Sequence, residues 1–295
     1  MQRVVYLLVY PLLWGIAKLP FWLFYKVSDI VFFILYYLVG YRKKVVLDNL
    51  KLAFPNKSEA ALKKIRKASY RHLCDVFLEM LKLLTMSKET HQKRFVFTNV
   101  EVIQEIEKTQ SVLVMLAHYA NWEWPVIIDQ YIEAKGFAVY RNIKNIYFDR
   151  LVKRMRGKYG SELITMSQVT RKVVANERNG IRGAYAMVGD QSPFKKAIRH
   201  WASFMGITVP FHNGTENLAK KLNMAVVYLK IEKVKRGYYE GTFIPLSTSP
   251  KEYKDFEITD LYIKEIEKQL HEAPEYYLWT HKRWKHRDLA SKKSS

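Results

Sequence analysis

Residues 111–124 read Ser-Val-Leu-Val-Met-Leu-Ala-His-Tyr-Ala-Asn-Trp-Glu-Trp, and the rest of the chain is organised around this stretch. Val112–Ala117 is a short, continuous apolar run, which is typical of a strand buried on both faces of a sheet. His118 follows at the expected end of that strand, and Glu123 comes five residues later. On one unbroken helix this spacing would put the two side chains about 140° apart. They can meet if His118 lies in the turn and Glu123 in the first turn of the next helix.

The residues around Glu123 are those of a helix start. Asn121 is a plausible cap for the helix, and Pro125 is tolerated in its first turn, where the helix dipole would help to keep Glu123 ionised. A carboxylate on one imidazole nitrogen leaves the other free to take a proton from a hydroxyl, which predicts His118 and Glu123 as a catalytic pair. The alternative is structural: an ordinary histidine at a strand end and an ordinary acid at a helix N-terminus.

Length, composition and charge limit the class of protein. The 295 residues could form one large domain or two small ones, and a hydrophobic fraction of 49% is enough for a core. The formal net charge of +21 indicates polyanionic partners, such as nucleic acid, an anionic membrane or a phosphorylated substrate. Cys74 is the only cysteine, so an intrachain disulfide is excluded, which fits a reducing, cytosol-facing location.

The N-terminal part of the chain is strongly apolar. Val4–Ala17 and Ile30–Tyr41 are apolar runs, and neither alone reaches the ~20 residues that cross a bilayer. A cleavable signal peptide is an alternative, but hydrophobicity resumes beyond its possible cleavage site at Ala17. Arg42 and the two lysines after it favour a cytoplasmic side for the rest of the chain. We therefore predict a retained N-terminal membrane anchor over residues 1–44.

Beyond the anchor, the pattern predicts one α/β domain over residues 45–290 with a mostly parallel central sheet flanked by helices. A short helix over Val45–Leu52 and a long amphipathic helix capped by Ser58 come first. The predicted apolar face of the long helix is Ala61, Leu62, Ile65, Ala68, Leu73, Val76, Phe77, Met80, Leu81 and Leu84. The predicted strands are Phe95–Val100, Val112–Ala117, Phe137–Tyr140, Glu162–Met166, Gly183–Val188, Met224–Ile231 and Tyr239–Leu246.

The helices predicted between and after these strands are Glu101–Lys108, a helix from Pro125 to Ala134, Ile146–Lys158, Ser167–Asn176, a helix ending at Leu222, and Thr259–Leu270. Trp201–Phe211 alternates only loosely between polar and apolar residues. The basic tail Ser291–Ser295 is predicted to be disordered.

Polar side chains follow three of the predicted strands. They are His118, Arg141, and the pair Asp190 and Gln191. Each alone could be structural, but ligands of open α/β sheets bind at the carboxyl ends of the strands. Their repetition at equivalent positions therefore favours a shared site.

These residues resemble the motifs of a known enzyme family. His118 and Glu123 fit the His-x4-Asp/Glu signature of glycerolipid and lipid A acyltransferases, and Asn121-Trp122-Glu123 has the form seen in the lipid A late acyltransferases. The C-terminal run from Pro274 to Arg287 is similar to that family's Pro-Glu-x-Tyr-x-Trp-x-His-Arg-Arg-Phe-Lys signature. Further similar blocks are Asn49-Leu50 with Phe54-Pro55, Tyr140-Arg141, Asp190-Gln191, and Phe204-x-Gly206 with Pro210, Gly214 and Leu218-Ala219. The sequence departs from the family pattern at Asn142, Lys282 and Trp284.

The resemblance implies transfer of a fatty acyl group from acyl carrier protein to a hydroxyl of a lipid A precursor in lipopolysaccharide biosynthesis. It implies a glycerolipid-acyltransferase-like domain at the cytoplasmic face of a bacterial inner membrane. His118 would act as the base while Glu123 fixes its tautomer. Asn121, Arg141, Asp190 and Gln191 would bind substrate, although Arg141 could instead form an ion pair with a carboxylate such as Asp190. No cofactor is expected, and the eight histidines have no convincing metal-ligand spacing.

Two other functions are compatible with parts of the sequence. One is an acyltransferase that acts on a lysophospholipid or an aminolipid, because the same base would activate those acceptors. The other is a membrane-associated, basic nucleic-acid-binding protein, because Lys282–Arg287 with Trp279 and Trp284 resembles a basic patch with stacking aromatics. No nucleic-acid-binding fold signature accompanies that patch, so we expect no nucleic-acid partner.

Overall fold

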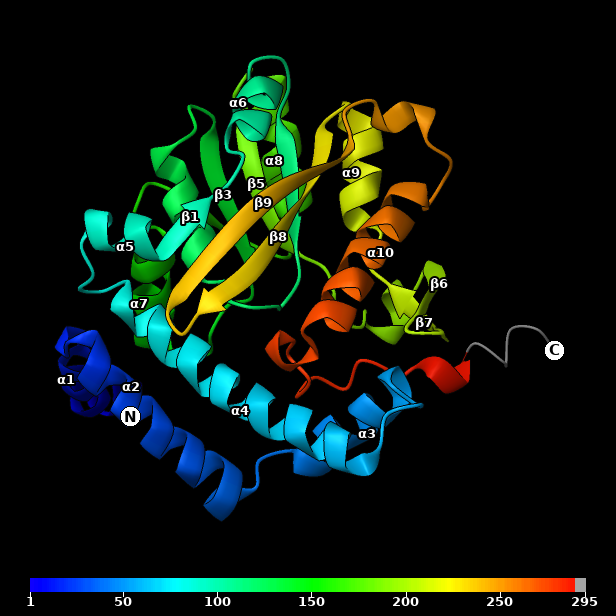
Figure 1. Cartoon of the computed structure of the whole chain (residues 1–295). Coiled ribbons are helices and arrows are strands. Elements are labelled where there is room, and N and C mark those ends of the chain that lie inside the picture. The colour runs from blue at the N-terminus through cyan, green and yellow to red at the C-terminus, as the bar shows by residue number, and fades with distance from the viewer. Residues whose placement is uncertain (290–295) are drawn as a thin grey trace.

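A seven-stranded sheet with helices on both sides forms the centre of the protein (Figure 1). The computed structural model describes residues 1–289, and the predicted disordered tail over 291–295 lies outside the described residues. The strand order is β1-β9-β8-β2-β5-β3-β4. The bounds are β1 Phe95–Phe97, β2 Val112–Leu116, β3 Lys135–Tyr140, β4 Glu162–Thr165, β5 Gly183–Val188, β8 Ala225–Lys235 and β9 Tyr238–Ser247.

Strand β2 is the middle strand in this order, and every one of its side chains is buried. It pairs in parallel with β5 on one side and with β8 on the other. β3 and β4 extend the parallel part, and only β8 with β9 forms an antiparallel pair within this sheet. The predicted α/β fold with a mostly parallel sheet is therefore confirmed.

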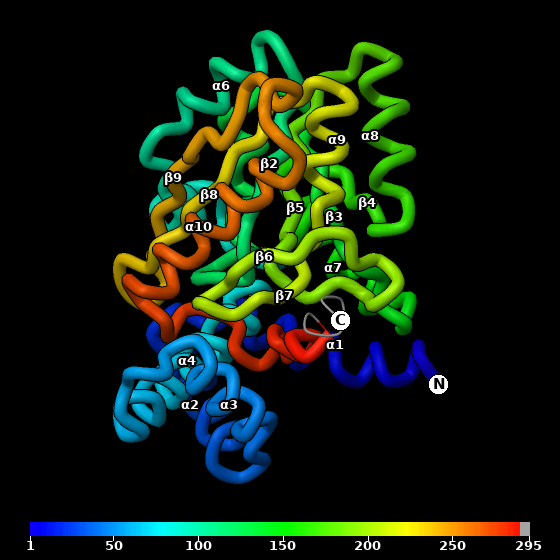
Figure 2. Tube along the Cα trace, turned by 90° about the vertical axis from the view of Figure 1, so that its right-hand side faces the viewer, coloured from blue at the N-terminus to red at the C-terminus, as the bar shows by residue number. Residues whose placement is uncertain are grey.

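A small hairpin lies beside α10 (Glu257–Glu272), and helices flank the sheet (Figures 1 and 2). The helices are α5 Lys88–Arg94, α6 Glu101–Glu107, α7 Ile146–Arg156, α8 Val169–Arg178, α9 Gly214–Leu222 and α10. The loosely alternating segment predicted around residues 201–211 is an antiparallel hairpin of β6 His200–Phe204 and β7 Ile207–Phe211, outside the main sheet. The helix predicted from Pro125 to Ala134 is wrong in length and type, since a 3₁₀ helix over Trp124–Gln130 stands there.

The long helix α4 (Glu59–Lys82) crosses the lower end of the sheet, where the carboxyl end of β2 lies (Figure 1). Ser58 caps it as predicted, because the Ser58 hydroxyl accepts a hydrogen bond from the Ala61 N–H at 3.2 Å. Its predicted apolar face is wrong at Phe77, which is 54% exposed. Its polar side, by contrast, is enclosed: Ser69, His72, Asp75, Glu79 and Lys82 are all buried.

The N-terminal residues form two helices that break at Pro20. α1 spans Gln2–Lys18, and α2 spans Phe21–Phe33 and continues without a break as a π-helix over Ile34–Val39. Leu19 is extended (ψ 144°), as a residue before proline usually is, which ends the first helix, and Pro20 is the N-cap residue of the second. The charged residues Lys26 and Asp29, which come before the apolar run Ile30–Tyr41, lie inside α2.

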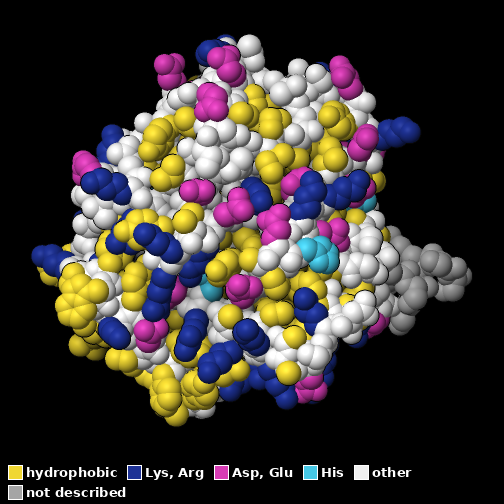
Figure 3. Space-filling model, in the orientation of Figure 1, with side chains coloured by type: hydrophobic (Ala, Val, Ile, Leu, Met, Phe, Trp, Pro, Cys, Tyr) yellow, Lys and Arg dark blue, Asp and Glu magenta, His cyan; other side chains and the backbone are white. Residues whose placement is uncertain are grey.

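Phe21–Val39 is one helical segment of 19 residues, long and apolar enough to cross a membrane by length and composition. At 1.5 Å per residue it measures about 28 Å, close to the thickness of the hydrocarbon core of a bilayer. Figure 3 shows hydrophobic side chains gathered along the lower left edge of the molecule, where Figure 1 places α1 and α2. The large apolar side chains exposed on these helices include Leu8, Leu12, Trp22, Ile30, Phe33 and Leu38.

The inner sides of α1 and α2 are docked on α4. Lys82 of α4 donates hydrogen bonds to the Ala17 carbonyl, at 3.0 Å, and to the Leu19 carbonyl. The Thr85 hydroxyl also donates to the Ala17 carbonyl, at 2.6 Å. A cation on the unpaired carbonyls at a helix C-terminus is favourable, so α4 caps α1. The segment predicted as an anchor, residues 1–44, therefore has two sides. Its outer side is the exposed apolar surface of α1 and α2, and its inner side contacts the domain. The next helix, α3 (Lys43–Ala53), begins one residue before the predicted end of the anchor at residue 44.

The exposed apolar side of α2 gives a test of membrane association. The double variant Trp22→Glu, Leu38→Glu should bind lipid vesicles as a smaller fraction of the protein. Each of the two side chains is 69% exposed, and burying one apolar side chain in the bilayer contributes about 2 kcal/mol to binding. The thermal unfolding midpoint in detergent should change little, since neither side chain belongs to the core. Vesicle flotation measures binding. Ile181→Glu, at an exposed apolar residue of the loop before β5, is the control, and equal flotation of all three proteins would contradict the assignment.

Candidate active site

The site is built where β2 and β5 end side by side. These strands run parallel in a register that pairs Leu116 with Val188, so the residues two positions further on, His118 and Asp190, come together. The His118 Nδ1 lies 2.7 Å from the Asp190 Oδ1. The side chain of Asp190 is 1% exposed, whereas that of His118 is 22% exposed. The pair therefore has a buried carboxylate and an imidazole that reaches the surface.

The protonation of this pair follows from its surroundings. Burial raises the pKa of Asp190, but the charge of His118 and its hydrogen bonds outweigh burial and hold the pKa below its usual value. An ionised Asp190 accepts a hydrogen bond from Nδ1–H, which leaves Nε2 of His118 as the acceptor nitrogen. The Gln191 amide nitrogen lies 3.5 Å from this Nε2. The geometry is that of a base with an amide group beside it.

The expected hydrogen bond between His118 and Glu123 is wrong, because each residue has another partner. The Glu123 carboxylate accepts two hydrogen bonds from the Arg156 guanidinium, from Nε at 2.8 Å and from Nη2 at 2.6 Å. Such bidentate pairs are among the stronger ion pairs of proteins. The sequence predicts a helix over Ile146–Lys158, which is a basic helix with Lys153, Arg154 and Arg156 in its last turn, but it does not predict Arg156 as a site residue. The basic helix gave no signal that distinguishes Arg156 from its neighbours.

Asn121 has a structural position rather than the expected contact with substrate. It is fully buried, and its Oδ1 accepts hydrogen bonds from the Glu123 N–H at 3.1 Å and the Trp124 N–H at 3.0 Å. Its Nδ2 donates to Glu79 at 2.7 Å. The predicted capping position is wrong, because Glu123 is the N-cap residue of the 3₁₀ helix, and Asn121 instead holds the turn that precedes this helix. The side chain of Asn121 is closed off from solvent in the structure.

Arg141 lies apart from this pair. It follows β3, which is separated from β2 by β5. The residue is exposed, and within residues 1–289 no hydrogen bond or ion pair holds it. The alternative ion pair with Asp190 is wrong, because the Asp190 carboxylate is bonded to His118.

The C-terminal motif holds the turn that carries His118. Leu278 N–H donates to the His118 carbonyl at 3.0 Å, and Ala120 N–H donates to the Tyr276 carbonyl at 3.0 Å. Between them Tyr119 and Tyr277 form an isolated antiparallel bridge. Ala120 has a φ of +48°, which costs a non-glycine residue about 1–2 kcal/mol, so the turn needs such support.

Only part of the predicted basic segment is a basic surface. Lys282, Lys285 and Arg287 are exposed. Arg283 is 1% exposed, and its guanidinium lies 3.9 Å from the ring centre of Phe211. Trp279 and Trp284 are buried as well, which excludes them as exposed stacking platforms. This segment is mainly structural.

Within residues 1–289, no group of three or more His, Cys, Asp or Glu side chains is arranged to hold a metal ion. The polar groups described at the site are His118 with Asp190, Gln191, and the Glu123–Arg156 ion pair.

Comparisons with known proteins point to one family. Residues 1–286 match the family model described as bacterial lipid A biosynthesis acyltransferase. Lipid A biosynthesis acyltransferase 2 of Shigella flexneri is 21% identical over 59% of this chain and 56% of its own length. Lipid A biosynthesis myristoyltransferase of Escherichia coli K12 is 24% identical over 51% of this chain and 47% of its own length. The chain thus spans about half the length of the curated relatives it matches.

The contact of His281 with the loop after Asp190 predicts an effect of acid on stability. His281 Nε2 accepts a hydrogen bond from the Ser192 N–H at 3.2 Å, and burial lowers the pKa of His281 to about 4. The unfolded chain, with a histidine pKa of about 6.5, takes the proton first, so stability is lost as pH falls from about 6.5 towards 4.

His281→Gln keeps an acceptor that does not titrate, so its unfolding midpoint should fall less over this pH range. The loss should be reduced and not abolished, since burial also lowers the pKa values of His72 and His91. Circular dichroism melts from pH 7.5 to pH 4 measure the difference. The same loss in both proteins would show that His281 is not held neutral.

Proposed function

Because the chain belongs to the bacterial lipid A biosynthesis acyltransferase family, we propose that it transfers a fatty acyl group from acyl carrier protein to a hydroxyl of a lipid A precursor. The observation that carries the proposal is the His118–Asp190 pair, whose free imidazole nitrogen reaches the surface at the carboxyl end of the central strand. The curated relatives are named as a lipid A biosynthesis acyltransferase and a lipid A biosynthesis myristoyltransferase, and this chain covers only about half of the length of each. The donor and the acceptor therefore belong to the proposal.

In the proposed reaction His118 is the general base. Its Nε2 takes the proton of the acceptor hydroxyl as the oxygen attacks the thioester carbonyl carbon. The tetrahedral intermediate collapses, the carbon–sulfur bond breaks, and the leaving thiolate takes the proton back from the imidazolium. The products are the ester and a free thiol, so the reaction balances with no cofactor. Asp190 fixes the tautomer and stabilises the imidazolium that forms in between.

The role first predicted for Glu123 changes in this mechanism. We assign Asp190 to orient His118, and we assign Glu123 to orient Arg156 through the bidentate ion pair. The remaining nitrogen of Arg156, Nη1, makes no hydrogen bond within the described residues. A guanidinium held in this way suits an oxygen of the substrate, either the developing oxyanion or a phosphate.

Gln191 and Arg141 are the proposed substrate-binding residues that the structure leaves accessible. The Gln191 amide, 3.5 Å from the His118 Nε2, lies where it could bond either the reacting hydroxyl or the thioester carbonyl. Arg141 is exposed after the second strand from β2, where its planar fork could bind a phosphate of the acceptor.

The proposed location is the cytoplasmic face of a bacterial inner membrane. The apolar surface of α1 and α2 would contact the bilayer, and the net charge of +21 would attract its anionic lipids. The same charge favours acidic acyl carrier protein and phosphorylated acceptors. The alternative acceptor is a lysophospholipid or an aminolipid, since a general base alone does not select among hydroxyls.

Three substitutions test the catalytic assignment. His118→Ala should remove most of the transfer activity, and Asp190→Asn should lower kcat by about 10²–10⁴-fold, because a carboxylate that fixes a histidine tautomer contributes on this scale. Glu123→Gln should also lower the rate, by weakening the hold on Arg156. Single-turnover transfer from an acyl carrier protein thioester is the measurement. Asp129→Asn is a control at another partly buried carboxylate, bonded to Ser161, and should keep the rate.

The donor is tested by salt. Acyl carrier protein is a polyanion, so the acyl carrier protein thioester should be a much better donor than the coenzyme A thioester of the same chain. Its KM should rise with ionic strength more than kcat falls, because screening weakens steering between opposite charges. Kinetics with both donors from low to high salt would measure this. Equal use of both donors with no effect of salt would remove acyl carrier protein and favour the lysophospholipid alternative.

A further inference from the structure

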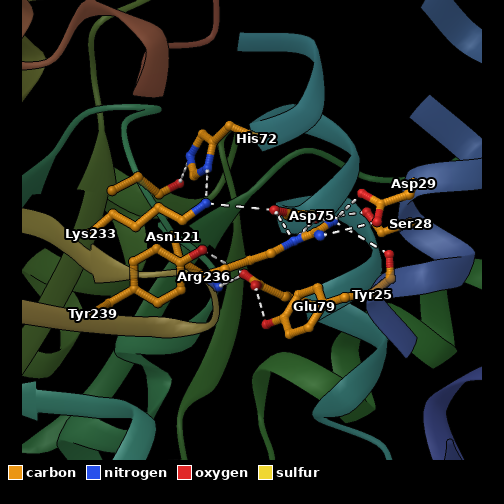
Figure 4. Close-up of polar contacts among 11 residues, drawn as sticks. Tyr25, Ser28, Asp29, His72, Asp75, Glu79, Asn121, Lys233, Arg236 and Tyr239 are labelled. Carbon is orange, nitrogen blue, oxygen red and sulfur yellow. Dashed lines mark hydrogen bonds and ion pairs between the residues drawn. The ribbon is translucent and has the colours of Figure 1, made fainter. Parts of the chain in front are cut away.

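A buried polar network joins the candidate membrane helix α2 to the turn that carries the site (Figure 4). Its middle is α4, from which His72, Asp75 and Glu79 point to the same side, because spacings of three and four place residues on one helix face. All three are buried. Their partners come from α2, from the turn at residues 118–124, and from the β8–β9 hairpin.

The side chain of Glu79 accepts hydrogen bonds from three different parts of the chain. Its Oε1 accepts a hydrogen bond from the Tyr25 hydroxyl of α2 at 2.7 Å. Its Oε2 accepts from the Asn121 amide at 2.7 Å and from the Tyr239 hydroxyl of β9 at 2.8 Å. The residue is 0% exposed, so these three bonds replace all of its water. A single carboxylate thus joins a candidate membrane helix, the site turn and the sheet.

The bond to Asn121 passes the position of Glu79 on to the site. The other end of the Asn121 amide accepts the Glu123 and Trp124 N–H groups. The Trp124 indole N–H also donates to the backbone carbonyl of Glu79, at 2.9 Å. Glu79 therefore holds the turn through its side chain and its backbone at once, directly beside the residue that binds Arg156.

The neighbouring contact acts on the strained residue of the turn. His72 Nε2 lies 3.1 Å from the carbonyl of Ala120, the residue with positive φ. The Lys233 ammonium lies 3.3 Å from the His72 Nδ1. Because the lysine can only donate, Nδ1 is the acceptor and Nε2–H donates to Ala120. Burial and Lys233 hold the pKa of His72 well below its usual value, in agreement with a neutral ring.

On the side of α2, two further contacts fix the helix. The Ser28 hydroxyl donates to Asp75 at 2.7 Å. Arg236 of the β8–β9 turn reaches Asp75 and Asp29 with the same guanidinium, at 2.8 Å and 2.7 Å. The position of α2 against α4 is thus specified by the buried Asp75 and its polar partners, and not only by apolar area.

We propose that Glu79 is a positioning residue for the acyl-transfer site, and that Tyr25 of α2 acts through it. The inference rests on the proposed function, since it assigns Glu79 a share in the rate of that reaction. Glu79 touches no reacting atom. It holds Asn121, and Asn121 holds the turn between His118 and Glu123, so a loss of the carboxylate lets both groups move relative to each other. Displacements of about 1 Å at a catalytic site can cost about 100-fold in rate.

The test compares substitutions that keep or remove the acceptor. Glu79→Gln keeps an oxygen for Asn121 and should keep kcat within about threefold, whereas Glu79→Leu should lower kcat by about 30- to 100-fold at nearly constant KM. Glu107→Leu is the matched control. Glu107 is also a buried carboxylate, bonded to the backbone N–H groups of Glu133 and Ala134. It should lose stability and keep kcat per folded molecule.

The contribution of α2 is tested by removing one hydroxyl. Tyr25→Phe should lower kcat about 3- to 10-fold, since it removes one of the three hydrogen bonds to the Glu79 carboxyl group and only part of that loss reaches the turn. Vesicle binding should be unchanged. Tyr37→Phe, at an exposed tyrosine of the same helical segment, is the control and should leave kcat unchanged.

A readout independent of acyl transfer separates this inference from the proposed function. The ring signals of His118, assigned by their loss in His118→Ala, should shift in nuclear magnetic resonance spectra of Glu79→Leu and not of Glu107→Leu. If the wild-type protein transfers no acyl group but these signals shift as expected, the function fails and the positioning role stands. Unshifted signals, or equal losses of kcat in Glu79→Leu and Glu107→Leu, would overturn the positioning role.

Discussion

Burial of the polar face of α4 is the constraint on which the rest of the structure depends. A helix with His72, Asp75, Glu79 and Lys82 on one side would normally turn that side to water. Here the side is enclosed by α2, by the site turn and by the β8–β9 hairpin, and each buried group has a partner. Since a buried charge without a partner costs several kcal/mol, each of these elements has only one favourable place. The layer of α1 and α2 and the sheet are thereby fixed relative to each other.

The site keeps two charge pairs separate. Asp190 is bonded to His118, and Glu123 is bonded to Arg156. One carboxylate therefore sets the proton position on a base, and the other sets the orientation of a cation. If Glu123 were bonded to His118 instead, as the sequence spacing suggests, the partly buried Arg156 would lose its counter-ion.

The alternation of strands and helices was predictable because local apolar runs, such as Val112–Ala117 and Gly183–Val188, indicate the strands. The partner of His118 was not, because it depends on the strand order. Only the placement of β5 beside β2 brings Asp190 to His118, and no spacing within one segment carries that information. The enclosed face of α4 was missed for a similar reason. Its residues are polar, and only their distant partners on α2 and the β8–β9 hairpin make burial favourable.

The polar side chains on the inner side of α2 have a consequence for how this protein could be re-engineered. A typical membrane anchor is modular and can be exchanged for another apolar helix of equal length. α2 has lipid-suited side chains outside but Tyr25, Ser28 and Asp29 inside, all bonded to the catalytic domain. A generic replacement would remove one partner each from Glu79, Asp75 and Arg236. Chimaeras between distant relatives should therefore exchange α2, α4 and the β8–β9 hairpin together, as one heritable unit.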